Sequence, residues 1–342
     1  MKGNEGAALK LVCPRCRRLE GNGSLYTASL VTASNTEATL GEVGDCSELR
    51  CSGCVARYPV VEGIPVVFPH PGELTHAHNP PWLPLDLGAE RLAAMLSAFG
   101  DSALAELCGR LGRYLWAGFN DWLPADEAAI DLPIHAKEVC RWIGATDRSD
   151  LLAVLGSAVG REAYEVGTRP VLLVDAHLAS LLTAKRLSEQ RQLEFVLQAE
   201  PGRWQPVSLS VPEGQQTAPL RLLCCDLADP PLLAGCLPEV LLPNVIDSVT
   251  SPYLVLGQSF ALRAEGANLT LTTPFAWKAE ITPMANQLPT FVGTSTSEEA
   301  LLRLVTELSP TARLIDQSEF RWAIWGSSRE QTLYRSAGYR FS

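Results

Sequence analysis

Two pairs of cysteines near the start of the chain have the spacing of metal-binding knuckles. Cys13 pairs with Cys16 and Cys51 with Cys54, with two residues inside each pair. Two thiolates from one turn can hold a single ion, and two such turns complete the tetrahedral four-sulfur site that zinc prefers. Cys46 is a spare that could replace Cys51, although its spacing forms no knuckle. The pattern predicts a closed structural zinc site without an open coordination position.

A second constellation surrounds a glycine turn in the middle of the chain. An apolar run at 151–155 leads into GSAVG at 156–160, and a helix is expected to follow. Glycines allow a tight turn and a close approach of the backbone, and a helix N-terminus offers free N–H groups. Asp175 ends the next apolar run, where a carboxylate can accept both hydroxyls of a ribose. Either NAD or S-adenosylmethionine (SAM) fits this arrangement, whereas a P-loop is excluded because no Gly-Lys-Ser/Thr follows.

Three later segments favour SAM over NAD. Asp226 ends the third apolar run, where an acidic side chain can reach the amino group of adenine. The fourth run is followed by LPNVIDSVTSP at 242–252, and the fifth leads into TTPFAWKAEITP at 272–283.

Together these segments resemble class I SAM-dependent methyltransferases over about residues 148–342, and most closely those of mercaptohistidine (ovothiol) biosynthesis. That family has GCAVGR at the glycine turn, NLIDRL-x-x-P after the fourth strand, and SP[YF]TW-x-x-E-[FY]TP after the fifth. The matching stretches here are GSAVGR (156–161), NVIDSVTSP (244–252) and TPFAWKAEITP (273–283). The resemblance implies a Rossmann-like α/β sheet with flanking helices and a methyl-transfer reaction.

Three positions depart from that family. Val154 stands where an acid normally contacts the amino-acid part of SAM, so its presence would weaken SAM binding or mark a degenerate enzyme. Ser157 replaces the cysteine of GCAVGR, and Ser248 replaces the arginine of NLIDRL. The sulfoxide-synthase region of some ovothiol enzymes is absent from this sequence.

The segment after the second knuckle carries a separate resemblance. It reads YPVVEGIPV at 58–66, and the Trm-type methyltransferase activator subunits have a CP-x-C knuckle followed by C-x-x-C…YPV-x-[DE]GIPV. The resemblance covers about residues 10–69. It implies a small zinc-ribbon module that activates a methyltransferase or is fused to one.

The methyltransferase resemblance places a cofactor site at the carboxyl ends of the strands. Asn244 could line the methionine part of SAM, and Asp247 could position or deprotonate a nitrogen nucleophile. Trp277 could wall the pocket and stack on a ring or cation. These three are the expected catalytic residues, with a helix-cap role for Asp247 and core packing for Trp277 as alternatives. The expected cofactor-binding residues are Gly156, Ser157, Ala158, Gly160, Asp175, Ala176, His177, Asp226, Leu227, Asn244 and Val245.

Aromatic side chains mark the expected substrate pocket. The segment RYLWAGFNDWL at 113–123 could line it or could simply pack the helices against the sheet. Trp322 and Tyr334 could reach the pocket mouth. The expected substrate-binding residues are Tyr114, Trp116, Phe275, Trp277, Trp325 and Arg329.

Hydrophobic periodicity predicts the elements that position these residues. Residues 1–69 form the zinc ribbon, 70–147 a linker and a helical lid, and 148–342 the methyltransferase domain. Within the last, four or five strands with helical crossovers imply a parallel sheet with helices on both faces, and the last two strands could form an antiparallel hairpin on its edge. An exposed insertion is expected at 199–219. His76 and His78 could bind a metal, but a solvated linker is favoured because no partner ligands lie nearby.

Composition bounds the function of the 342-residue chain. Hydrophobic residues make up 46% and charged residues 19%, which is typical of globular proteins and excludes general disorder. The net charge of −10 argues against nucleic-acid binding. No apolar run is long enough to span a bilayer, and the first residues lack the apolar stretch of a signal peptide. A cytoplasmic location is therefore expected.

Three functions remain open. The favoured one is methyl transfer to a small molecule, at a nitrogen of an amino-acid or imidazole-like metabolite such as a 5-thiohistidine. The second is methylation of a protein or RNA docked through the zinc ribbon. The third is a catalytically degenerate SAM-fold scaffold for a partner enzyme. A homodimer, or a partner protein held through the ribbon, is also left open.

Overall fold

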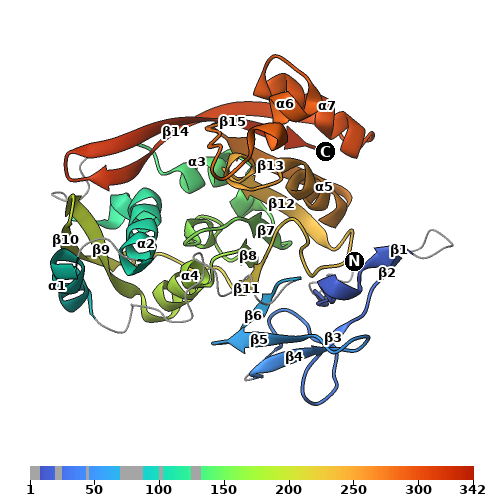
Figure 1. Ribbon diagram of the computed structural model, residues 1–342, viewed down its shortest axis with the longest axis horizontal. Helices are drawn as coiled ribbons and strands as arrows, with labels where there is room; N and C mark the ends of the chain where they lie inside the picture. The colour runs from blue at the N-terminus through green and yellow to red at the C-terminus, as the bar shows by residue number, and fades with distance from the viewer. Residues whose placement is uncertain (1–7, 20–24, 44–45, 70–87, 100–102, 125–131) are drawn as a thin grey trace.

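The computed structural model describes the chain except for residues 1–7, 20–24, 44–45, 70–87, 100–102 and 125–131. The expected linker with His76 and His78 lies outside the described residues. An eleven-stranded sheet runs through the molecule, with helices on both of its faces (Figure 1). None of the described helices is long and apolar enough to cross a membrane.

Seven strands of this sheet have the order β11-β8-β7-β12-β13-β15-β14. The first five are parallel to one another, whereas β15 is antiparallel to both of its neighbours. This confirms the predicted Rossmann-like α/β sheet with its terminal hairpin. The strands are β7 (Leu152–Leu155), β8 (Val171–Asp175), β11 (Leu220–Cys225), β12 (Leu237–Pro243), β13 (Arg263–Thr273), β14 (Leu314–Ser327) and β15 (Glu330–Phe341).

Side chains of the buried strands point alternately to the two faces of the sheet and pack into two separate hydrophobic cores. In β7, Leu152 and Val154 point to the face covered by α3 and α4, while Ala153 and Leu155 point to the face covered by α5, α7 and the ribbon. This period of two is why both faces of a central parallel strand must be apolar. The covering helices are α3 (His135–Trp142), α4 (Leu178–Gln190), α5 (Pro252–Leu262) and α7 (Ser297–Leu308).

The N-terminal ribbon extends the same sheet. Strand β6 pairs in parallel with β11, and β5, β4 and β3 follow outward, so the sheet is continuous between the two regions (Figure 1). The expected boundary at residue 69 therefore falls just after a strand of the shared sheet. The ribbon elements are η1 (Pro14–Cys16), β1 (Arg18–Leu19), β2 (Leu25–Tyr26), β3 (Leu30–Val31), β4 (Glu48–Cys51), β5 (Arg57–Val61) and β6 (Ile64–Val67).

Helices α1 and α2 pack together with a second hairpin, β9–β10. Helix α2 packs on β9 and β14, and α1 packs on β10. Val207 and Leu209 of β10 are buried. The expected exposed insertion at 199–219 is thus in part a regular strand with one buried face, while Pro206, Ser208 and Ser210 on its other face are exposed. The elements are α1 (Ala89–Phe99), α2 (Ala103–Phe119), η4 (Asn120–Trp122), η5 (Ala145–Asp147), β9 (Gln192–Glu200) and β10 (Arg203–Ser210).

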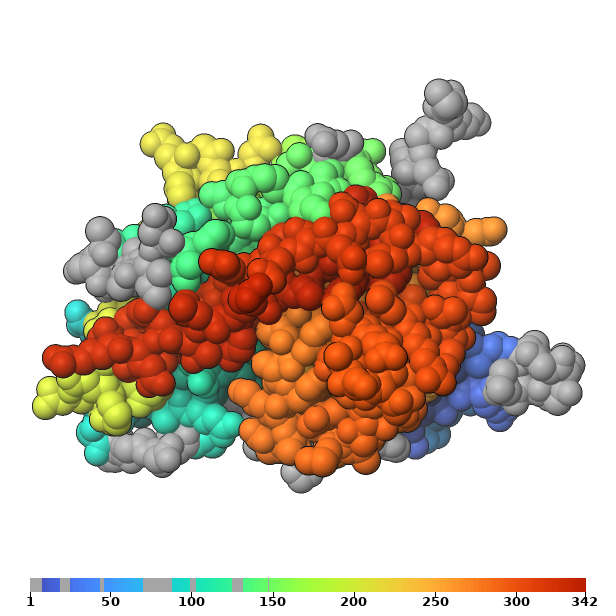
Figure 2. All heavy atoms as spheres, turned by 90° about the horizontal axis from the view of Figure 1, so that it is seen from above, coloured from blue at the N-terminus to red at the C-terminus, as the bar shows by residue number. Residues whose placement is uncertain are grey.

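The helix predicted directly after the glycine turn is reduced to one 3-10 turn, η6 (Arg161–Tyr164). The ligand-facing N–H groups expected from a longer helix are therefore limited to this turn and the loop before it. The terminal hairpin β14–β15 (red) crosses the face seen in Figure 2, from the α6–α7 region (orange) toward β9–β10 (yellow-green). The remaining short helices are η7 (Ile246–Ser248), η8 (Met284–Asn286) and α6 (Leu288–Val292).

Candidate functional site

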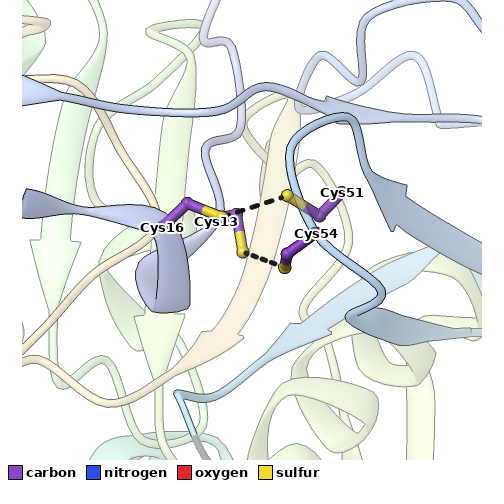
Figure 3. Close-up of side chains that lie close together, drawn as sticks. All are labelled: Cys13, Cys16, Cys51 and Cys54. Atoms are coloured by element: carbon purple, nitrogen blue, oxygen red, sulfur yellow. Dashed lines mark hydrogen bonds between the residues drawn. The ribbon is translucent and has the colours of Figure 1, made fainter.

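The cysteines of the two predicted knuckles lie together, with their sulfur atoms all within 4.8 Å of one another (Figure 3). The Sγ atoms of Cys13 and Cys54 are 3.9 Å apart, and those of Cys16 and Cys51 are 3.5 Å apart. Four sulfurs at about 2.3 Å from a tetrahedral zinc ion lie about 3.8 Å from one another. The group can therefore hold a metal ion, and Cys46 is not a member of it among the described residues.

Backbone N–H groups point at two of these sulfurs. The N–H of Gly53 donates to Cys51 Sγ at 3.2 Å, and the N–H of Ala56 donates to Cys54 Sγ at 3.4 Å. The second contact lowers the pKa of the Cys54 thiol. Metal binding needs thiolates, so donors aimed at sulfur fit a ligand set rather than free thiols.

A cavity of about 350 Å³ lies at the carboxyl ends of β7, β8, β11, β12 and β13. Open α/β sheets bind ligands at this position, where the strand order reverses. All eleven residues expected to bind the cofactor line the cavity, together with Asp247 and Tyr114. The fold thus brings these distant segments together, and their individual roles stay predictions.

The glycine turn can take its shape only with glycine at both ends. Gly156 has φ +81°, and a Cβ placed there would lie 2.2 Å from a methyl of Val245. Gly160 has φ +72°, and a Cβ there would lie 2.5 Å from a methyl of Leu173. The N–H of Gly156 donates to the Val174 carbonyl at 2.7 Å, which fixes the turn against β8. The backbone therefore forms the cavity wall without side chains in the way.

Asp175 is a buried carboxylate tied to both sides of the crevice. Its oxygens accept the N–H groups of Ala158 and His177, each at 2.8 Å. Burial raises the pKa of Asp175 to about 6, and these two donors oppose the rise. A carboxylate oxygen has two acceptor positions, so Asp175 can still accept hydrogen bonds from a bound hydroxyl.

Asp226 begins a tight loop after β11. Its Oδ1 accepts the N–H of Ala228 at 2.8 Å, and its carbonyl accepts the N–H of Asp229 at 3.2 Å. Both Asp226 and Leu227 line the cavity. The loop holds the carboxyl group at the edge of the cavity that lies over β11.

Asn244 is the centre of a hydrogen-bond network that links four elements. Its Oδ1 accepts the hydroxyls of Thr272 at 3.2 Å and Ser336 at 2.7 Å, so its amide nitrogen faces His135 Nε2 at 3.3 Å. An amide nitrogen can only donate, so Nε2 is the acceptor and the ring proton is on Nδ1. Burial lowers the pKa of His135 to about 4, which keeps the imidazole neutral near pH 7.

Asp247 points one oxygen at the backbone and leaves the other unpaired. Its Oδ2 accepts the N–H of Ala276 at 2.8 Å, while Oδ1 is buried without a hydrogen-bond partner among the described residues. Ser157 Oγ is also buried without a hydrogen-bond partner among the described residues, and both Ser157 and Asp247 line the cavity. Burial raises the pKa of Asp247. Helix α5 takes Ser251 as its N-cap, so Asp247 is not the cap of that helix.

Backbone strain collects at the same crevice. Ala158, Asn244 and Phe275 have φ values of +45°, +53° and +51°, at the ends of β7, β12 and β13. A left-handed conformation costs a residue other than glycine about 1–2 kcal/mol. Strain of this kind persists where the surrounding structure fixes a functional geometry.

Three of the residues expected to bind substrate lie away from the cavity. Trp116 is fully buried, and its ring centre lies 5.4 Å from that of Trp325. The indole N–H of Trp325 donates to the Gln198 carbonyl at 2.9 Å. Arg329 is exposed in the turn between β14 and β15. The two tryptophans belong to an apolar core between α2, β14 and β9.

Phe275 and Trp277 also lie outside the cavity lining. Both pack against the core formed by α5, α7 and the ribbon. The indole N–H of Trp277 donates to the Ser297 hydroxyl at 2.9 Å, and the Phe275 ring lies 6.5 Å from that of Tyr339. The core-packing alternative describes the placement of Trp277.

The aromatic wall of the cavity comes from Tyr114, one of the residues expected to bind substrate, and from Trp322 and Tyr334, which are expected at the pocket mouth. The rings of Trp322 and Tyr334 are stacked, with centres 4.7 Å apart and an angle of 21°. His135 and Lys278 line the cavity too, and neither has a local signal in the sequence. Trp322 and Tyr334 are paired neighbours in the β14–β15 register.

Glu162 is a further lining residue that sequence analysis missed. It follows the glycine turn, and only 5% of its surface is exposed. Burial raises the pKa of its carboxyl to about 7.

Arg161 ties the helical lid to the glycine turn. Its guanidinium forms two hydrogen bonds with Asp121, at 2.6 and 2.9 Å, and donates to the Gly118 carbonyl at 2.8 Å. It also pairs with Glu165 at 2.7 Å and lies 4.2 Å from the centre of the Trp122 ring. The side chain is buried and fully engaged, so it holds the end of α2 over the cavity.

Comparison with known proteins gives only distant likeness. The sequence matches no protein-family model and no curated protein. Solved structures with a similar fold include a SAM-dependent methyltransferase from Aquifex aeolicus (TM-score 0.37, 13% identity, 60% of this chain and 88% of that chain). Another is magnesium protoporphyrin IX methyltransferase from Synechocystis with bound SAM (TM-score 0.37, 12% identity, 60% of this chain and 76% of that chain). A third is an arsenic(III) S-adenosylmethionine methyltransferase from Chlamydomonas reinhardtii (TM-score 0.36, 18% identity, 64% of this chain and 73% of that chain). With TM-scores this low, function has to be inferred from the site's own residues.

Proposed function

We propose that this protein is a SAM-dependent methyltransferase that acts on a small molecule. The observation that carries the proposal is the single cavity that joins the glycine turn, Asp175, Asp226, Asn244 and Asp247 at the switch point of the sheet. Two buried oxygens in its wall, Ser157 Oγ and Asp247 Oδ1, lack partners among the described residues. Buried polar atoms of this kind are costly unless a ligand satisfies them.

Each part of SAM has a candidate partner in the cavity. The glycine turn provides room for the sulfonium end, Asp175 accepts the ribose hydroxyls, and Asp226 accepts from the adenine amino group. Val154 is fully buried in the core and cannot replace the acid of related enzymes. Glu162 is the carboxylate that would take the ammonium of the methionine part, since a cation relieves its burial.

Bound SAM supplies an activated methyl group for in-line displacement. The protein's part is to align the acceptor, exclude water and manage the acceptor's proton. Asp247 has a raised pKa and a free buried oxygen, which suits a proton acceptor or an anchor for a nitrogen nucleophile. The neutral His135 ring, fixed through Asn244, offers a directed Nδ1–H donor.

The aromatic wall indicates the class of acceptor. The stacked pair of Trp322 and Tyr334, with Tyr114, presents flat apolar surface beside His135 and Lys278. Such a wall suits a planar heterocycle or a cationic amine. The acceptor proposed is therefore a nitrogen of an amino-acid or imidazole-like metabolite, with a 5-thiohistidine as one case. The lid helices that enclose this wall favour a small acceptor over a docked protein or RNA.

The ribbon's ion is proposed to be zinc. Four thiolates in a closed tetrahedral set are its preferred structural ligands, and they leave no position for a substrate. The chemistry of methyl transfer is thus assigned to the cavity and not to the metal.

Titration calorimetry with SAM and with S-adenosylhomocysteine (SAH) tests the proposal on the zinc-loaded full chain. Micromolar binding of either supports it, and D226N is expected to weaken SAH by about tenfold because a charge-assisted hydrogen bond is lost. The matched control is E307Q on the exposed side of α7. If the wild type binds neither ligand, the methyltransferase proposal is overturned.

A further inference from the structure

The first knuckle of the ribbon lies directly against the loop that follows β11. The N–H of Val12 donates to the Pro231 carbonyl at 3.0 Å. Its neighbour Leu11 forms an antiparallel bridge with Leu232. These contacts join the residues immediately before Cys13 to the far end of the loop.

Arg17, immediately after Cys16, holds the same loop from the other side of the knuckle. Its guanidinium forms an ion pair with Asp229 and donates to the carbonyls of Pro230 at 2.7 Å and Leu232 at 3.1 Å. The Arg17 side chain is only 14% exposed. Three contacts from one planar cation fix the position of the loop as well as its conformation.

The near end of this loop is part of the cavity. Asp226 and Leu227 line the cavity, and Asp226 is bonded to the N–H groups of Ala228 and Asp229. The residue that Arg17 pairs with is thus hydrogen-bonded to the residue assigned to adenine. Only three positions separate Asp226 from Asp229, so movement of one end must move the other.

The ribbon also holds the strand that leads into the loop. Val66 and Val67 of β6 pair in register with Cys224 and Cys225 of β11. Asp226 is therefore placed by ribbon contacts on the strand before it and on the loop after it.

We propose that Arg17 is a positioning residue for the adenine end of the nucleoside site, and that the metal-bound knuckle and the bound nucleoside stabilise each other through the loop 226–232. The inference rests on the proposed SAM site. Because such coupling is reciprocal, metal loss must weaken nucleoside binding and nucleoside binding must protect the metal.

The test compares SAH with S-inosyl-L-homocysteine, in which an oxygen replaces the adenine amino group. Calorimetry on wild type is expected to show tighter binding of SAH, because Asp226 accepts from the amino group. In R17A, SAH binding is expected to weaken by about tenfold while the inosine analogue changes less, so discrimination between the two falls. R17K should recover part of the discrimination, and D229N should lower it.

The matched control is R57A. Arg57 is another ribbon arginine, it pairs with Glu48 within the ribbon, and its side chain is 64% exposed. The variant R57A should leave the affinities for SAH and for the inosine analogue unchanged. A merely structural role for Arg17 would weaken both analogues equally, and that result overturns the proposal, as does an R17A or D229N protein that binds like wild type. If wild type binds neither analogue, the proposed function fails and the inference fails with it.

Metal retention gives a second readout that needs no activity. The chelator concentration that removes half of the zinc is expected to rise about fivefold in the presence of saturating SAH, and this rise should disappear in R17A. Equal retention with and without SAH, beside normal SAH binding, would overturn the coupling alone.

Discussion

The ribbon and the crevice reach their geometry by different routes. In the ribbon, each of two local turns brings one pair of thiols together, and the two turns meet to close the cluster. In the crevice, the lining residues come from five strands, two lid helices and the terminal hairpin. Local spacing therefore specifies the first site, whereas tertiary packing specifies the second.

The largest expected effect tests the local site. The variant C51S removes one of four thiolates and should release the ion, because structural zinc contributes on the order of 10 kcal/mol to small folded modules. Zinc content and proteolysis of the ribbon give the readout. C46S is the matched control and should keep the ion. Full zinc occupancy in C51S, or zinc loss in C46S, would contradict the assigned ligand set.

The next effect tests how the crevice depends on tertiary contacts. The variant R161A removes a buried cation from Asp121 and Glu165, so Glu165 loses this partner and Asp121 keeps only the more distant Lys137, at 3.7 Å, among its described ion pairs. The free energy of unfolding in urea should fall by about 3–5 kcal/mol. R141A is the control, because Arg141 pairs with Glu138 on an exposed face of α3 and should cost less than about 1 kcal/mol. Equal costs for the two variants would show that the lid is not anchored by Arg161.

These two regions also explain how much the sequence could predict. The four cysteines, the glycine turn and the acids at strand ends have local signatures, and the structure brings each group together. His135 and Lys278 have none, because their place in the cavity depends on how α3 and the loop after β13 pack. The aromatic wall of the cavity was equally hard to predict, because sequence spacing does not tell which tryptophan faces a pocket and which faces a core.

The expected roles of Trp116 and Trp325 illustrate this limit. Both have aromatic neighbours and lie in the predicted elements, yet they pack on each other between α2 and β14. Trp322 lies three residues before Trp325 on the same strand and lines the cavity instead. The register is unbroken between the two residues, so strand alternation places them on opposite faces, but it does not tell which face borders the cavity.

A smaller effect is expected from Glu162, on the way the free energy of unfolding depends on pH. Its pKa is about 7 when folded, against an ordinary value of 4.5, so between these pH values the folded protein keeps a proton that the unfolded chain has released. The contribution of Glu162 to the free energy of unfolding is therefore fully present below pH 4.5. It is lost as the pH rises through 7, and the loss amounts to about 3 kcal/mol at most. Unfolding free energies of wild type and E162Q at pH 5 and pH 8 give the measurement.

The comparison with the ribbon sharpens that test. Lys10 lowers the pKa of the exposed Glu37, so the stability from Glu37 is lost as pH falls and E37Q should change the pH profile in the opposite direction. If E162Q keeps the full pH dependence of wild type, Glu162 is not a buried acid in the cavity wall.

The smallest expected effect tests the strain in the glycine turn. Ala158 has φ +45°, which costs an L-residue about 1–2 kcal/mol, and glycine would relieve this. The added freedom of the unfolded chain offsets about 0.4–1 kcal/mol. The variant A158G should therefore raise the free energy of unfolding slightly, by less than about 1 kcal/mol. Ala163, buried in the 3-10 turn that follows, is the matched control, since A163G should lower it by about 1 kcal/mol. A loss of stability in both variants would mean that the turn holds Ala158 without strain.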